Sequence, residues 1–126
     1  MARILIIDDD DSIREMLRLG LERSGHDVSE ASDGSSGLAA NRSAAVDLVI
    51  TDIVMPGMEG LETILEFRRH YPALKVIAMS GGGRGKACDY LSIASRLGAH
   101  RVIAKPFSIG KIGTLVDELL QGTASA

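Results

Sequence analysis

Five polar side chains in this 126-residue sequence have the types and positions to form one chemical site. Each stands at the carboxyl end of a short apolar run, and together they are Asp8, Asp9, Asp52, Ser80 and Lys105. If these runs are neighbouring parallel strands, their carboxyl ends share one edge of a sheet, which is where open α/β folds bind ligands. Three carboxylates, a hydroxyl and an ammonium group from distant parts of the chain would then meet there.

This cluster of charges predicts a bound cation and a phosphate. Two carboxylates about 4 Å apart repel each other by roughly 4 kcal/mol at an effective dielectric constant of about 20, so a proton or a cation must offset the repulsion. The aspartates offer only hard oxygen ligands, and no His or Cys converges with them, which favours Mg²⁺ over Zn²⁺. Lys105 is a point charge suited to a phosphate oxygen, and Ser80 can donate one hydrogen bond. Such groups are typical of phosphoryl transfer, in which an Asp carboxylate can be the nucleophile.

Five short apolar runs predict the strands that would position this site. They span residues 3–7, 26–31, 46–51, 75–79 and 101–104. The first, third, fourth and fifth runs are nearly continuous in Ile, Val and Leu, which is typical of strands buried on both faces of a parallel sheet. The second run alternates polar and apolar residues, which favours an edge of the sheet.

The first helix is predicted directly after the acidic run. Ser12 and Glu15 match a capping box, with Ser12 as the N-cap residue, and Gly25 follows the last turn as a stop signal. Asp10 and Asp11 precede this helix, whose dipole favours negative charge at its start. We therefore expect these two acidic residues to serve the helix and not the chemical site.

Further helical patterns lie between the later runs. Apolar residues at helical spacing predict helices around residues 61–68, 91–95 and 109–119, and Ser108 can cap the last of these. Ala content predicts one more helix over residues 34–45. Strand and helix therefore alternate five times, which predicts an α/β fold in which right-handed crossovers place helices on both faces of a parallel sheet.

The chain resembles, over essentially its whole length, the receiver domains of two-component response regulators. The matching stretches are residues 4–10, 47–60, 79–80 and 105–107, which read ILIIDDD, DLVITDIVMPGMEG, MS and KPF. Each stretch alone is moderately specific, but all four in this order and spacing form a strong signal. The resemblance implies a flavodoxin-like, doubly wound, five-stranded parallel sheet of order 2-1-3-4-5, flanked by five helices.

The resemblance also implies a role for each site residue. Asp52 would accept a phosphoryl group from a histidine kinase or a histidine phosphotransfer protein, and Ser80 and Lys105 would contact the phosphoryl oxygens. The implied ligands of Mg²⁺ are Asp8, Asp9, Asp52 and the backbone carbonyl of Val54. The family often has a cis bond before the proline that matches Pro106, which would aim Lys105 inward.

Such a protein is a phosphoacceptor signalling domain and not an enzyme, because it assists only its own phosphorylation and dephosphorylation. Phosphorylation of Asp52 would switch a protein-interaction surface.

We expect one receiver domain over residues 1–121 and a short flexible tail over 122–126. The chain either acts alone on a downstream protein target or belongs to a longer protein whose effector domain is missing here, and Met1 and the short tail favour the first.

The composition argues against several other classes. The chain has 14 basic and 17 acidic residues, for a net charge of −3, whereas direct binding to nucleic acid relies on a basic surface. No apolar run approaches the roughly 20 residues of a membrane span, and the start lacks the features of a signal peptide. A single cysteine, Cys88, excludes an internal disulfide. We therefore expect a cytoplasmic protein without membrane insertion.

Two other functions fit part of the pattern. A Mg²⁺-dependent phosphohydrolase of the aspartyl-nucleophile type usually has a second Asp two residues after the nucleophile, where this chain has Val54. A receiver-like interaction module that never accepts phosphate often loses some of the acidic, hydroxyl or lysine groups, all of which are present here.

One position departs from the family pattern. Many receivers have Tyr or Phe three residues before the lysine of the last strand, and this chain has Val102 there. A glycine-rich segment, residues 81–86, follows Ser80, and glycine permits many backbone conformations. Our hypothesis is that Ser80 and residues 81–86 shift together when Asp52 is phosphorylated.

Overall fold

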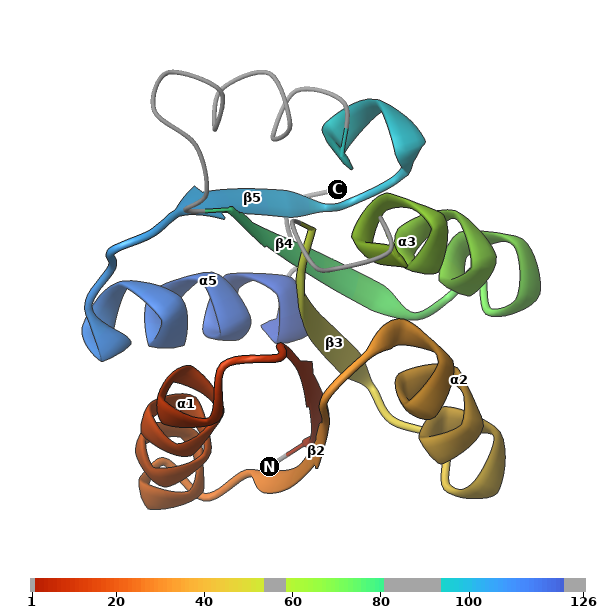
Figure 1. Ribbon diagram of the computed structural model, residues 1–126. Helices are drawn as coiled ribbons and strands as arrows, with labels where there is room; N and C mark the ends of the chain where they lie inside the picture. The colour runs from red at the N-terminus through yellow and green to blue at the C-terminus, as the bar shows by residue number, and fades with distance from the viewer. Residues whose placement is uncertain (1, 54–58, 81–93, 122–126) are drawn as a thin grey trace.

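The computed structural model describes residues 2–53, 59–80 and 94–121 of the chain (Figure 1). Five strands form one sheet, in which each pair of neighbouring strands is parallel. The strand order is β2-β1-β3-β4-β5. The predicted α/β fold and the predicted strand order are therefore confirmed.

The elements alternate along the chain as the sequence predicted. The strands are β1 (Arg3–Ile7), β2 (Asp27–Ala31), β3 (Leu48–Asp52), β4 (Lys75–Ser80) and β5 (Arg101–Ala104). The helices are α1 (Asp11–Arg23), α2 (Gly34–Ser43), α3 (Glu59–His70) and α5 (Ile109–Gln121), and residues 94–97 are also helical. Five helical segments therefore flank the sheet.

The position of each strand in the sheet explains its burial. Every residue of the central strand β3 is buried, and β1 and β4 are buried after their first residues. The alternating strand β2 lies at one edge, as predicted. Strand β5 is not buried on both faces as its apolar run suggested, because it is the other edge strand, and Ile103 is its one buried residue. Val102 is 37% exposed.

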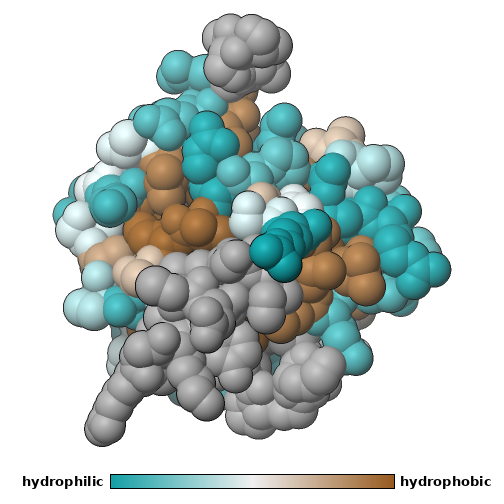
Figure 2. Space-filling model, turned by 90° about the horizontal axis from the view of Figure 1, so that it is seen from above, coloured by the Kyte–Doolittle hydropathy of each residue, from teal (hydrophilic) through white to brown (hydrophobic). Residues whose placement is uncertain are grey.

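The sheet separates two hydrophobic clusters. Helices α1 and α5 cover one face, and α2 and α3 cover the other (Figure 1). Alternate residues of β1 point into different clusters, since Ile4 and Ile6 pack with α1 and α5, whereas Leu5 and Ile7 pack on the opposite face. Figure 2 looks onto the molecule from the β5 side, where hydrophobic and hydrophilic side chains are mixed on the surface.

Helix α1 begins differently from the predicted capping box. The N-cap residue is Asp10 and not Ser12, because Oδ1 of Asp10 accepts hydrogen bonds from the backbone N–H groups of Ser12 and Ile13, at 2.8 and 3.2 Å. The prediction that Asp10 serves the helix is confirmed. Gly25, beyond the end of α1, has a φ of 97°, which glycine adopts without strain.

The start of α5 agrees with the sequence. The hydroxyl of Ser108 accepts a hydrogen bond from the backbone N–H of Lys111 at 3.1 Å, so Ser108 caps this helix as predicted.

Several other predictions concern residues that lie outside the described part of the chain: the ligand Val54, the segment 81–86, the beginning of the helix around residue 91 and the tail 122–126. Within the described ranges, every helix is too short or too polar to cross a membrane.

His100, which directly precedes β5 and contacts β4, should make the stability of the fold depend on pH. Nδ1 of His100 accepts a hydrogen bond from the backbone N–H of Val76 at 3.1 Å, so this nitrogen carries no proton in the folded protein. Partial burial lowers the pKa of His100 below its ordinary value of 6.5, and the nearby cations Arg68, Lys75 and Arg101 lower it further. Protonation of His100 is therefore easier in the unfolded chain.

The titration of His100 should leave the free energy of unfolding unchanged above about pH 6.5 and should lower it as the pH drops below that value. The reason is that the unfolded state then binds the proton more readily than the folded state. The variant His100→Asn keeps an acceptor oxygen for Val76 but does not titrate. Urea unfolding at about pH 7.5 and about pH 5.5 should show a smaller loss of stability in the variant than in the wild type. Equal losses in the two proteins would contradict this assignment.

Candidate functional site

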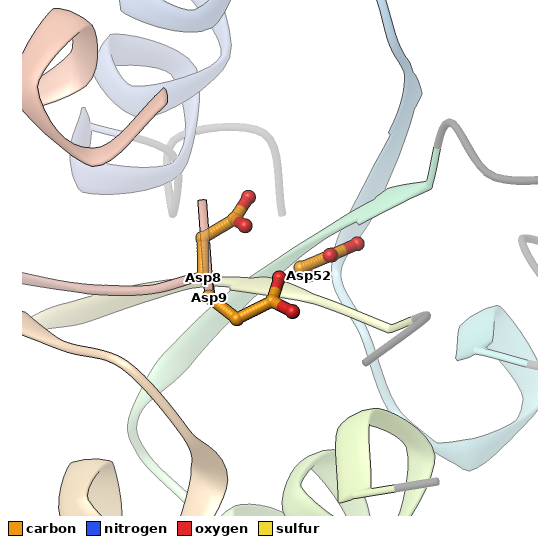
Figure 3. Close-up of side chains that lie close together, drawn as sticks. All are labelled: Asp8, Asp9 and Asp52. Atoms are coloured by element: carbon orange, nitrogen blue, oxygen red, sulfur yellow. The ribbon is translucent and has the colours of Figure 1, made fainter. Parts of the chain in front are cut away.

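The carboxyl ends of β1 and β3 bring three aspartates together (Figure 3). Asp8 and Asp9 follow β1, and Asp52 ends β3. One carboxylate oxygen from each residue lies within 4.8 Å of the other two. Asp8 is fully buried, Asp52 is 4% exposed and Asp9 lies at the surface. We call these three residues the acidic pocket; the prediction that they converge is confirmed.

Asp8 is held on every side by hydrogen bonds. Its Oδ2 accepts from Nζ of Lys105 at 2.8 Å, and its Oδ1 accepts from the backbone N–H of Asp10 at 2.9 Å. Its own backbone N–H donates to the carbonyl of Ala31 at 3.2 Å, which extends the pairing of β1 with β2 by one residue. The two bonds to its carboxylate oxygens fix the buried side chain of Asp8 in the acidic pocket.

Lys105 supplies positive charge between two of the carboxylates. Its Nζ lies 2.8 Å from Oδ2 of Asp8 and 3.5 Å from Oδ2 of Asp52. The bond between Lys105 and Pro106 is cis, and the side chain of Lys105 points into the site. Burial lowers the pKa of Lys105, but the hydrogen bond to Asp8 and the charge of Asp52 outweigh burial and raise it above 10.5. The ammonium group therefore stays charged at neutral and mildly alkaline pH.

Ser80 ends β4 beside Lys105. The backbone N–H of Lys105 donates to the carbonyl of Ser80 at 2.8 Å, which joins the ends of β4 and β5. Ser80 is fully buried, and its hydroxyl makes no hydrogen bond within the described structure. A buried hydroxyl without a partner costs stability, so a hydroxyl in this position is suited to a ligand oxygen.

The acidic pocket fits a hard divalent cation. It holds three carboxylates, whereas Lys105 is the one cationic side chain within 4 Å of them among the described residues. Carboxylate oxygens that leave room for water molecules are the ligands that Mg²⁺ prefers. Asp8, Asp9 and Asp52 are the side chains that would hold the ion.

The sequence prediction missed one side chain that touches the pocket. Arg14 on α1 donates from Nη1 to the backbone carbonyl of Asp8 at 2.6 Å. It also pairs with Asp11 on its own helix and with Glu30 on β2. The spacing of Asp11 and Arg14 by three residues is typical of an ion pair on a helix, and this signal could have drawn attention to Arg14. Its contacts to Asp8 and Glu30 depend on the tertiary fold.

The fold and the acidic pocket together define a class of signalling domains with five parallel strands and an acidic site at the strand ends. Comparison with known families makes the assignment, since the family model of the response regulator receiver domain matches residues 4–117. The chain belongs to the response regulator receiver domain family. Receiver domains generally bind Mg²⁺ at an acidic pocket and pair with histidine kinases.

Similar proteins agree with this assignment. The chain is 39% identical over 119 residues to the transcriptional activator protein PfeR of Pseudomonas aeruginosa. The match covers 94% of this chain and 38% of PfeR. It is 31% identical to the sensor kinase CckA of Brucella abortus, over 95% of this chain and 13% of that protein. The crystal structure of the receiver domain of NtrX from Brucella abortus superposes with a TM-score of 0.87 at 32% identity, over 94% of this chain and 98% of that domain.

Proposed function

We propose that the chain is a phosphoaccepting receiver in which Asp52 takes a phosphoryl group in a Mg²⁺-dependent reaction. The observation that carries this proposal is the placement of Lys105, whose ammonium lies 2.8 Å from Asp8 and 3.5 Å from Asp52. The backbone of Lys105 is hydrogen-bonded to Ser80 at the end of β4. A second anion near Asp52 would meet this cation, and the buried hydroxyl of Ser80 at the end of the neighbouring strand β4 is a donor without a partner in the described structure. Val54 would add its backbone carbonyl to the Mg²⁺ ligands, as the family resemblance implies.

Asp52 is the nucleophile of the proposed reaction, and Lys105 and Ser80 stabilise charge. A carboxylate oxygen of Asp52 attacks the phosphorus atom, and the phosphorus–nitrogen bond of a phosphohistidine donor breaks as the new oxygen–phosphorus bond forms. The electron pair of the broken bond goes to the donor imidazole. Lys105 and Ser80 stabilise the charge on the phosphoryl oxygens. Bound Mg²⁺ would supply positive charge against the repulsion between the carboxylates and the phosphoryl group.

The partners follow from this reaction. The donor would be a histidine kinase or a histidine phosphotransfer protein, and the output would pass to a downstream protein target or to an effector domain outside this chain. The chain spans 38% of the length of PfeR and 13% of the length of CckA. The remaining parts of these two proteins have no counterpart in this domain, so their activities are not assigned to it. We propose a cytoplasmic signalling domain that assists only its own phosphorylation and dephosphorylation, and that neither contacts nucleic acid directly nor inserts into a membrane.

Mass spectrometry tests this proposal. The protein is incubated with Mg²⁺ and phosphoramidate, and we expect one added phosphoryl group that is absent from the variant Asp52→Asn and from samples with the metal chelated. Rapid release of phosphate over many turnovers without an adduct would instead indicate a phosphohydrolase. An unmodified protein after treatment with phosphoramidate and with a cognate kinase would indicate an interaction module.

A further inference from the structure

We propose that Arg14 is a positioning residue that fixes the peptide group between Asp8 and Asp9, and thereby the geometry of the acidic pocket. The inference rests on the proposed function, because it concerns the same Mg²⁺ site. The hydrogen bond from Nη1 of Arg14 reaches the backbone oxygen of Asp8, at 2.6 Å. That oxygen belongs to the peptide that joins Asp8 to Asp9, so its orientation sets the direction in which Asp9 leaves the strand.

Two further contacts hold the guanidinium group of Arg14 in place. Nε lies 3.2 Å from Oε1 of Glu30 on β2, and Nη2 pairs with Asp11 at the start of α1. The side chain of Arg14 is 15% exposed. Since a planar guanidinium presents its donors in fixed directions, contacts on three of its nitrogens leave it little freedom to rotate. The carbonyl of Asp8 is therefore held by a rigid donor that is anchored on both α1 and β2.

The charge of Arg14 is balanced outside the acidic pocket. Burial lowers the pKa of Arg14, but the hydrogen bonds and charges of Asp11 and Glu30 outweigh burial and raise it, so the guanidinium is always charged. Its two carboxylate partners match this charge locally. Lys105, in contrast, binds the carboxylates of the pocket directly. Arg14 thus contributes orientation to the pocket, whereas Lys105 contributes positive charge.

Asp9 is the residue that depends most on this orientation. The buried carboxylate of Asp8 is held by its hydrogen bond from Lys105, which reaches it from the end of β5. Asp9 lies at the surface, and its carboxylate joins the other two only if the preceding peptide keeps its direction. Loss of the Arg14 contact should therefore leave Asp8 and Asp52 in place and should misplace one of the three oxygens that would bind Mg²⁺.

Arg18 provides a matched control on the same helix. It lies one turn after Arg14 and pairs with the same residue, Glu30, at 2.7 Å, and with Glu22 at 3.3 Å. Within the described residues, neither contact involves the acidic pocket. The variants Arg14→Met and Arg18→Met each remove one arginine that pairs with Glu30, and methionine favours a helix about as well as arginine does. The two variants differ in the hydrogen bond to Asp8.

The experiment is a calorimetric titration of the unphosphorylated proteins with Mg²⁺ at one fixed ionic strength. We expect Arg14→Met to bind Mg²⁺ about tenfold more weakly than the wild type, in the range seen when an outer partner of a metal ligand is removed. Arg18→Met should stay within about twofold of the wild type, because an exposed ion pair contributes little. In the metal-free proteins, the amide hydrogen of Asp10 should exchange faster in Arg14→Met than in Arg18→Met.

The outcomes separate this inference from the proposed function. If the wild type binds no Mg²⁺, the proposed function fails. If the wild type binds Mg²⁺ and Arg14→Met binds it equally well, the role of Arg14 is wrong, and equal weakening in Arg18→Met would also overturn it. Urea unfolding of each variant checks that it is folded, and Arg14→Gln, whose shorter side chain also loses the contact, replaces Arg14→Met if the latter does not fold.

Discussion

Replacement of Lys105 by methionine should slow phosphorylation of Asp52 by about a hundredfold, the cost typical of removing one group that stabilises charge in a transition state. The ammonium lies 2.8 Å from Asp8 and 3.5 Å from Asp52, and methionine cannot replace its charge or its hydrogen bond. Phosphorylation rates with phosphoramidate, measured by mass spectrometry at saturating Mg²⁺, would show this loss.

The same substitution should increase the degree to which Mg²⁺ stabilises the fold. Lys105→Met leaves the buried carboxylate of Asp8 without its cationic partner, which lowers the free energy of unfolding in the absence of metal. Because the ion would then supply the missing charge, Mg²⁺ should raise the unfolding temperature of the variant more than that of the wild type. Lys111→Met, at an exposed position of α5, is the control and should change neither property. A variant that loses Mg²⁺-dependent stabilisation altogether would contradict the role assigned to Lys105.

Replacement of Phe67 by alanine should lower the free energy of unfolding by about 3–5 kcal/mol, the usual cost of removing a buried aromatic ring. Phe67 on α3 is fully buried in the cluster between α3 and the sheet, and its ring centroid lies 6.1 Å from that of Tyr71. The cavity left by the ring would not be filled by the surrounding strand residues, because these are part of a closely packed sheet.

Urea unfolding measures this effect, and a second residue of α3 provides the control. Leu65 is 40% exposed, so Leu65→Ala should cost less than about 1 kcal/mol. Both variants should still accept a phosphoryl group at conditions in which they are folded, since neither side chain belongs to the acidic pocket. Similar losses of stability at the two positions would contradict the assignment of Phe67 to the core.

The convergence of the site could be predicted because it follows from topology. Asp8 and Asp52 each end a parallel strand, and the carboxyl ends of neighbouring parallel strands share one edge of the sheet. The strand order itself came from the family resemblance, and without it the runs of Ile, Val and Leu gave strands but no neighbours. Those runs also could not show that β5 lies at an edge, since burial depends on a partner strand that the local sequence does not encode.

Local competition and tertiary contacts explain what was missed. Both Asp10 and Ser12 are good N-cap residues, and the geometry of the turn after Asp8 decides for Asp10, whose oxygen reaches two backbone N–H groups. In the sequence, Arg14 is an ordinary surface residue of a predicted helix. Its pairing with Glu30 depends on the packing of α1 against β2. Lys105 was expected to contact a phosphoryl oxygen, whereas its hydrogen bond to Asp8, 97 residues away in the sequence, is a property of the folded chain.

The division of the interior by the sheet affects how the sequence can evolve. Neighbouring residues of β1, such as Leu5 and Ile6, pack into different clusters, so a change of volume on one face needs no compensation on the other. Each cluster can therefore drift independently, provided that the alternation along the strands is kept. The acidic pocket lies at the ends of these strands and depends on their backbone register, so two lineages can differ widely in their interiors and still hold Asp8 and Asp52 side by side.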